Sequence, residues 1–257
     1  MVNTRREFCS FLGIALLGLN RKLIAQQESD FLAKSFQNSR GKRMLYRLFI
    51  PARYESRQKY PLVLWLHGGA GRGNDNVSQI SGGNTAGSHV WTLPENQTRY
   101  PCFVFAPQCP AGEEWATLTN TQPTGQLHLA LEILQHLQRT YSIDDQRLFV
   151  AGQSLGGFGT WSAITLQPKL FASAIPVCGG GDESQAAKLV NTSIWAFHGE
   201  KDEAVSVERT RRMVEAIRKA GGTPRYTEYK DAGHVIWEKV FHEPELQPWM
   251  FSQRRAN

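Results

Sequence analysis

The sequence of 257 residues contains few cysteines, and their spacing does not match a metal-binding motif. Its four cysteines are Cys9, Cys102, Cys109 and Cys178, and no two of them form a Cys-x-x-Cys pair. Zinc and iron–sulfur sites commonly use such closely spaced pairs, so we expect no metal and no cofactor. Cys102 and Cys109 flank an apolar run whose ends would stand roughly 20 Å apart in a strand, too far for a disulfide. We expect free, buried thiols, with a Cys109–Cys178 pair as the alternative.

The sequence also lacks low-complexity tracts, long internal repeats and a strong excess of one charge. The formal net charge is +6. Within the first 25 residues, Arg5, Arg6, Arg21 and Lys22 stand against Glu7, which leaves +3 for the remainder. Such a weak charge does not indicate nucleic-acid binding. A chain of this length is sufficient for one α/β domain with a large core.

Residues 1–25 resemble an export signal. Thr4–Phe8 reads Thr-Arg-Arg-Glu-Phe, which is similar to the twin-arginine pattern, and a moderately apolar run follows over Phe11–Leu19. That run is short for a bilayer span, and Leu23–Ala25 is suited to precede a cleavage site. No cysteine follows for a lipid anchor. We therefore predict export to the periplasm or outside the cell, by the twin-arginine route rather than the general route. An amphipathic helix that stays attached is the alternative.

From residue 26 to residue 257, apolar runs alternate with helical patterns. The sequence predicts strands over 45–50, 62–66, 102–106, 148–151, 172–178, 194–197 and 225–229, the first of them at a sheet edge. Helices are predicted over 124–141 and 158–166, from a cap at Ser206 to a stop at Gly221-Gly222, and at the C-terminus. This alternation indicates a mainly parallel sheet with helices on both faces and with ligands at the carboxyl ends of the strands.

Ser154 lies in the pattern Gly152-Gln153-Ser154-Leu155-Gly156, between a predicted strand and a predicted helix. Such a strand–turn–helix junction is so tight that glycine is needed two residues to either side of the serine. The turn lifts the hydroxyl clear of the sheet. Ser154 is therefore the candidate nucleophile.

A serine nucleophile needs a base, and the base needs a carboxylate to orient it. Asp202 follows the strand predicted over 194–197, and His234 follows the last predicted strand, which is the chain order expected after a nucleophile elbow. Glu200 is the rival for the acid. His198 and His242 are rivals for the base, although His198 is expected to be packed and hydrogen-bonded and His242 to lie on the surface.

Two backbone N–H groups are expected to bind the oxyanion that forms during attack on a carbonyl. One is the N–H of Leu155, directly after the nucleophile. The other is expected in the glycine-rich turn His67-Gly68-Gly69-Ala70-Gly71, where Gly69 is the first choice and Gly68 and Ala70 are close alternatives.

Together these motifs resemble the α/β-hydrolase superfamily over about residues 40–253. Within it, the chain is similar to exported esterases and "predicted peptidases" related to feruloyl and acetyl-xylan esterases and to prolyl-oligopeptidase-type hydrolases. The resemblance rests on the turn after residue 66, on Gly152–Trp161, and on the segments Ala196–Asp202 and Asp231–His234. It implies an α/β-hydrolase fold, Asp202 as acid and His234 as base.

The resemblance implies a serine esterase that acts on small-molecule or polysaccharide-linked esters, without nucleic acid and without a stable membrane anchor after processing. Trp91, Trp115 and Trp237 are candidates to flank the substrate, because aromatic rings suit sugar or aryl groups. A serine peptidase with the same residues is one alternative. A non-catalytic binding protein on a hydrolase fold is another, although it would not need all three of Ser154, Asp202 and His234. No motif indicates an oligomeric state.

Overall fold

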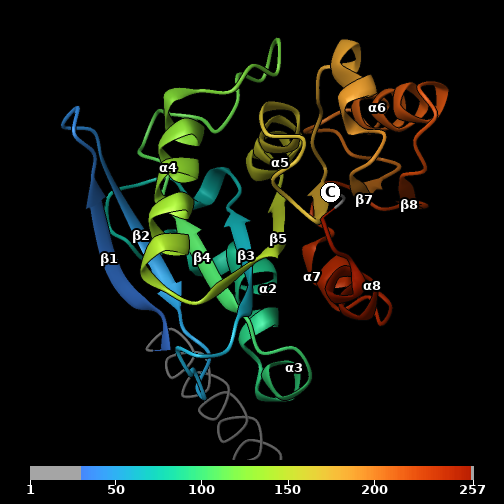
Figure 1. The fold of residues 1–257 in the computed structure, drawn as a ribbon. Helices are drawn as coiled ribbons and strands as arrows, with labels where there is room; N and C mark the ends of the chain where they lie inside the picture. The colour runs from blue at the N-terminus through green and yellow to red at the C-terminus, as the bar shows by residue number, and fades with distance from the viewer. Residues whose placement is uncertain (1–29, 256–257) are drawn as a thin grey trace, which may run out of the picture.

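The computed structural model describes residues 30–255, which form an eight-stranded sheet flanked by helices (Figure 1). The export signal predicted for residues 1–25 lies outside this range and stays a prediction. The strand order is β1-β2-β4-β3-β5-β6-β7-β8. The strands are β1 (Leu32–Gln37), β2 (Arg43–Phe49), β3 (Tyr60–Leu66), β4 (Phe103–Pro107), β5 (Ile143–Gln153), β6 (Ser173–Val177), β7 (Ser193–Gly199) and β8 (Arg225–Tyr229).

Six of the strands are parallel. β4, β3, β5, β6, β7 and β8 pair in parallel, whereas β1 and β2 pair antiparallel to each other and β2 pairs antiparallel to β4. The carboxyl ends of the six strands consequently lie at one edge of the sheet, where ligands bind in folds of this kind. The predicted fold class, a mainly parallel α/β sheet with helices on both faces, is confirmed.

The prediction of an edge strand over residues 45–50 is wrong. That segment is β2, and β1 covers its outer side. The sequence Leu-Ala-Lys-Ser-Phe-Gln of β1 has no buried position, and only Phe36 is half-buried, so it shows no hydrophobic alternation by which to recognise a strand.

Alternate side chains of β3 point to opposite faces of the sheet. Leu62 and Leu64 pack in one core cluster with α4 (Gly125–Thr140), α5 (Leu155–Leu166) and α6 (Glu208–Lys219). Val63 and Trp65 pack in the other, which includes α2 (Thr85–His89), α7 (Trp237–Phe241) and α8 (Leu246–Ser252). A strand that is buried on both faces reads as a continuous apolar run, as this one does. A further short helix, α3 (Pro94–Arg99), precedes β4.

The helix ends predicted from the sequence are confirmed in part. The predicted cap at Ser206 is wrong, because Val207 occupies the N-cap of α6 and its side chain makes no capping bond. The predicted stop is confirmed: Gly221 has φ +98°, and the Gly222 N–H donates to Ile217 O at 2.9 Å. The single C-terminal helix is instead α7 and α8, separated at Pro244, which cannot continue a helix. None of the helices within residues 30–255 has the length and hydropathy needed to cross a membrane.

Candidate active site

Ser154 lies in the tight turn between β5 and α5. Its φ is +54°, a left-handed conformation that is rare for residues other than glycine. A Cβ added at Gly152 would lie 2.3 Å from Gly156 O, and one added at Gly156 would lie 1.8 Å from Leu66 O. Both glycines are therefore required by close backbone approach, as predicted. The Ser154 N–H donates to Val177 O at 2.8 Å, which fixes the turn to β6.

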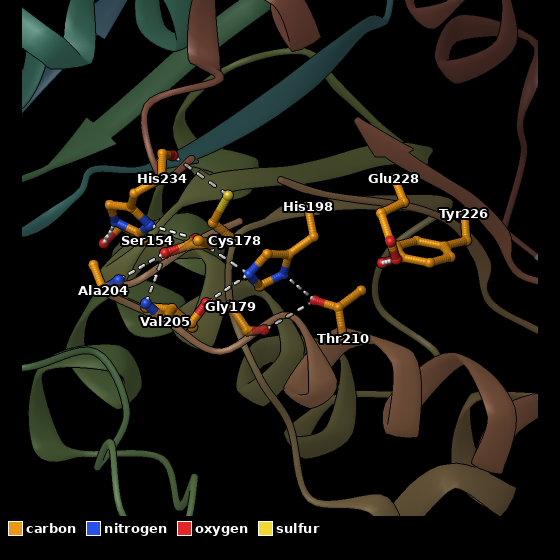
Figure 2. A network of polar contacts seen from close by, with 11 residues as sticks. Ser154, Cys178, Gly179, His198, Ala204, Val205, Thr210, Tyr226, Glu228 and His234 are labelled. Atoms are coloured by element: carbon orange, nitrogen blue, oxygen red, sulfur yellow. Dashed lines mark hydrogen bonds and ion pairs between the residues drawn. The ribbon is translucent and has the colours of Figure 1, made fainter. Parts of the chain in front are cut away.

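The loops after β7 and β8 bring Asp202 and His234 to this turn, and Figure 2 shows His234 beside Ser154. His234 Nε2 lies 2.9 Å from Ser154 Oγ, and His234 Nδ1 lies 2.6 Å from Asp202 Oδ2. The two loops touch at Gly199, where an added Cβ would lie 2.1 Å from Gly233 O. Ser154, His234 and Asp202 therefore form a continuous chain of two hydrogen bonds.

Asp202 is a buried carboxylate with several donors. Its Oδ1 accepts from the N–H groups of Ala204 at 2.9 Å and Val205 at 2.8 Å, while Oδ2 accepts from His234. Burial would raise the pKa of Asp202, but the hydrogen bonds from His234 and Val205 outweigh it, so the pKa lies below its ordinary value. The group is thus ionised and able to stabilise a charged imidazole.

The rival residues lie elsewhere. Glu200 points to the adjacent turn, where its Oε2 accepts from the Asp231 N–H at 2.9 Å. His242 is exposed just beyond α7, 3.5 Å from Glu238 Oε2. His198 is fully buried and hydrogen-bonded, as expected, but it also approaches Asp202. The geometry supports Asp202 and His234 over these alternatives.

The turn after β3 contains a peptide group of fixed orientation. His67 Nε2 accepts from the Cys109 N–H at 3.0 Å, so its proton is on Nδ1, which donates to Gly68 O at 2.7 Å. Burial lowers the pKa of His67 to about 4 and keeps this ring neutral. Because every described peptide bond is trans, holding Gly68 O turns the Gly69 N–H to the opposite side.

The same turn is attached to the nucleophile turn by two buried amides. Asn84 Oδ1 accepts from the Gly68 N–H at 2.9 Å, and Gln153 Nε2 donates to Gly83 O at 2.7 Å. The Gly68 N–H is therefore occupied, which favours Gly69 over Gly68 as an oxyanion donor. The roles of His67 and Asn84 in holding this turn are not predicted from the sequence. Asn84 lies in a long irregular connection and carries no motif.

Two of the three tryptophans proposed to flank the substrate lie in the core. Trp91 is 1% exposed and packs on Phe241, and Trp115 is 0% exposed and packs on the His67 ring. This corrects the expectation, since neither ring is available at a pocket mouth. Trp237 stands perpendicular to the His234 ring with centroids 5.1 Å apart.

Val235, next to His234, is 77% exposed and provides an apolar group beside the base. Val235 is not among the substrate-binding residues predicted from the sequence. Its neighbour Ile236 is buried, so only one of the two apolar residues after His234 faces outward.

Cys178 directly follows β6 with φ +47°, and its thiol lies 3.5 Å from His234 O. Its sulfur and atoms of Asp202 and His234 lie within 4.8 Å of one another, close enough to be considered as a metal site. The fit is poor, because His234 and Asp202 already bind each other and burial raises the pKa of the Cys178 thiol, disfavouring the thiolate that a metal needs. Cys102, Cys109 and Cys178 are free and buried, as predicted.

Comparison with known proteins shows similarity to esterases. Residues 37–246 match the Esterase family model, described as "Putative esterase". A solved thermostable esterase is 39% identical, with a TM-score of 0.86 over 90% of this chain and 64% of its own. A ferulic acid esterase structure is 17% identical, with a TM-score of 0.65 over 86% of this chain and 97% of its own, which shows the shared fold.

Among curated proteins, the bifunctional acetylxylan esterase/xylanase XynS20E of Neocallimastix patriciarum is 23% identical over 159 residues. That alignment covers 62% of this chain and 22% of the relative. The chain thus spans less than two thirds of the length of this relative and of the thermostable esterase. It belongs to the Esterase family and has the α/β-hydrolase fold.

Proposed function

We propose that the protein is a serine hydrolase that cleaves carboxylic esters, with Ser154 as nucleophile, His234 as general base and Asp202 as orienting acid. The observation that carries the proposal is the pair of hydrogen bonds, 2.9 Å and 2.6 Å long, that link these three side chains in order. Membership of the Esterase family supports it.

In the proposed reaction, His234 Nε2 takes the Ser154 hydroxyl proton while Oγ attacks the ester carbonyl. The charged imidazole is stabilised by Asp202 and then delivers the proton to the leaving alcohol, which leaves an acyl group on Ser154. Water, deprotonated by His234, releases the acyl group. Because the thiol of Cys178 is buried and protonated, it does not compete as a nucleophile.

The backbone N–H groups of Leu155 and Gly69 are proposed to hold the oxyanion. Leu155 follows the nucleophile as the first residue of α5, and the Gly69 N–H points away from the carbonyl bound by His67. Two preorganised donors of this kind stabilise the transition state more than the ground state.

The proposed substrates are short-chain acyl esters, including acyl groups on plant polysaccharides. Relatives named as acetylxylan and ferulic acid esterases support this class. The exposed Val235 beside His234 suits a small apolar or aryl acyl group, while Trp237, 8% exposed, packs against the His234 ring. Esters are expected to react faster than amides, because an alkoxide leaves more readily than an unprotonated amine. We further propose that the protein is exported, on the signal resembling a twin-arginine leader in residues 1–25.

The test compares the wild type with Ser154→Ala on p-nitrophenyl acetate, acetylated xylan, a feruloyl ester and a matched peptide anilide. We expect ester hydrolysis by the wild type and a loss of about 10⁶ in turnover in the variant. Val235→Ser, with the triad unchanged, is expected to raise KM for the aryl ester more than for the acetyl ester. Equal activity of Ser154→Ala and wild type would refute the proposal, and better cleavage of the anilide would reassign the enzyme as a peptidase.

A further inference from the structure

Asp202 is approached by a second imidazole, that of His198. His198 Nε2 lies 3.2 Å from Asp202 Oδ2, the same oxygen that binds His234. The side chains of His198 and Asp202 are both fully buried. His198 is the last residue but one of β7, four positions before Asp202 in the chain, and its ring lies between Val205 and Thr210 (Figure 2).

The partners of His198 fix which ring nitrogen carries the proton. Nε2 lies 2.9 Å from Val205 O and 3.2 Å from Asp202 Oδ2, and both oxygens only accept hydrogen bonds. Nε2 must therefore be protonated. Nδ1 lies 2.8 Å from the Thr210 hydroxyl on α6, which is able to donate to it. Burial lowers the pKa of His198, so the ring is neutral with its proton on Nε2.

Few other ionisable groups face this ring. Glu228 is its neighbour on β8, but that carboxylate is bound by Arg211 from α6 and by the Tyr226 hydroxyl. Directly after β6, the Cys178 thiol is protonated, because burial raises its pKa. The remaining groups are Asp202 and His234 themselves. The ionisable groups next to the His198 ring are thus those of the proposed catalytic pair, Asp202 and His234.

We propose that His198 is a positioning residue that donates its Nε2 proton to Asp202 Oδ2 and so limits how strongly Asp202 stabilises protonated His234. The proposal rests on the proposed function. Oδ2 has two donors, and each one withdraws electron density from the oxygen that the other binds. Without the donor from His198, Asp202 holds the charged form of His234 more strongly.

The expected consequence is a shift in the pH at which activity is lost. When the His198 donor is absent, His234 keeps its proton to a higher pH, so the acidic limb of the kcat/KM profile moves upward. The contact is long and shared with Val205 O, so we expect a shift of about half a pH unit, equivalent to roughly threefold in rate on that limb.

Two amide variants separate this role from packing. In His198→Gln the side-chain nitrogen reaches the position of Nε2 and keeps the donor to Asp202. In His198→Asn the amide is one methylene shorter and reaches only the position of Nδ1, beside Thr210. Neither amide titrates. We expect an unshifted limb for His198→Gln and the upward shift for His198→Asn, with thermal unfolding measured for both.

The same quantity is measured without catalysis by NMR. In a Ser154→Ala background, the titration midpoint of the His234 Cε1–H resonance should rise with His198→Asn and stay unchanged with His198→Gln. In the wild type, the ¹⁵N spectrum should show His198 Nε2 protonated from pH 5 to pH 9.

Equal midpoints in the two variants, or an unprotonated Nε2 in the wild type, would overturn the proposal. An unprotonated Nε2 in the wild type overturns the proposal even if neither variant folds. If the wild type proves to have no esterase activity, the proposed function fails, and the NMR titration still decides the role of His198.

Discussion

Replacing Asp202 by asparagine should convert His234 from a proton acceptor into a proton donor toward Ser154. The Ala204 and Val205 N–H groups both point at Oδ1, so the amide oxygen of the asparagine will occupy that position. Its NH₂ group then faces Nδ1 of His234, 2.6 Å away in the wild type, and donates to it. The proton of the neutral ring moves to Nε2, where it cannot accept the hydroxyl proton of Ser154.

The loss has two parts, the wrong tautomer and the missing negative charge beside the imidazolium. Together they are expected to reduce kcat by about 10⁴, or about 5 kcal/mol of transition-state stabilisation. The new NH₂ also faces the protonated Nε2 of His198, so the variant should unfold at a lower temperature. The assay is steady-state hydrolysis of p-nitrophenyl acetate, with thermal unfolding followed by circular dichroism.

Glu200→Gln is the matched control, because it makes the same chemical change two residues away. Glu200 accepts only from the exposed Asp231 N–H, and its amide would keep an acceptor there. We expect kcat within about twofold of the wild type, as for other surface substitutions. A larger loss in Glu200→Gln than in Asp202→Asn would refute the assignment of the acid.

Three further predictions follow from buried contacts. Asn84→Ala removes the hydrogen-bond partner of the Gly68 N–H, so the turn that contains the proposed oxyanion donor is no longer held in place. We expect kcat to fall roughly 10- to 100-fold with little change in KM. An unchanged kcat would contradict this role of the turn. Gly156→Ala would place a Cβ 1.8 Å from Leu66 O, and we expect no folded protein by circular dichroism, whereas a folded, active variant would show that the turn yields. Burial lowers the pKa of His67 and of His89 to about 4. As the pH falls below 6.5, the unfolded chain therefore binds protons at these histidines before the folded protein does. The free energy of unfolding, measured by urea unfolding, should drop between pH 6.5 and pH 4 by up to roughly 3 kcal/mol for each histidine.

Local chemistry explains why part of this structure is predictable from sequence. The order of strand, turn and helix around Ser154 depends on glycines within two residues of it, and their steric role is visible in the sequence. Asp202 and His234 each follow a strand, and these strands are recognisable as apolar runs or by the glycine turns next to them. The position of both residues at the sheet edge then follows from the parallel fold. The candidate nucleophile, acid and base therefore come from short-range patterns combined with strand order.

Contacts set by the long connections are not visible in this way. Asn84 reaches Gly68 only because the segment after β3 folds back over the end of that strand. Trp91 and Trp115 lie on long connections and look exposed in sequence, yet both are buried against core aromatic rings. The expected packing of His198 is confirmed, whereas its approach to Asp202 depends on how the three residues between them turn back.

The most direct test of the central claim is covalent labelling by a fluorophosphonate, followed by peptide mass spectrometry. Such a probe reacts with a serine whose hydroxyl proton is taken by a neighbouring base. We predict one label per chain, located on Ser154, absent in Ser154→Ala and strongly slowed in His234→Ala. Labelling of another serine, or equal labelling of the wild type and His234→Ala, would contradict the assignment of Ser154 and His234 as nucleophile and base.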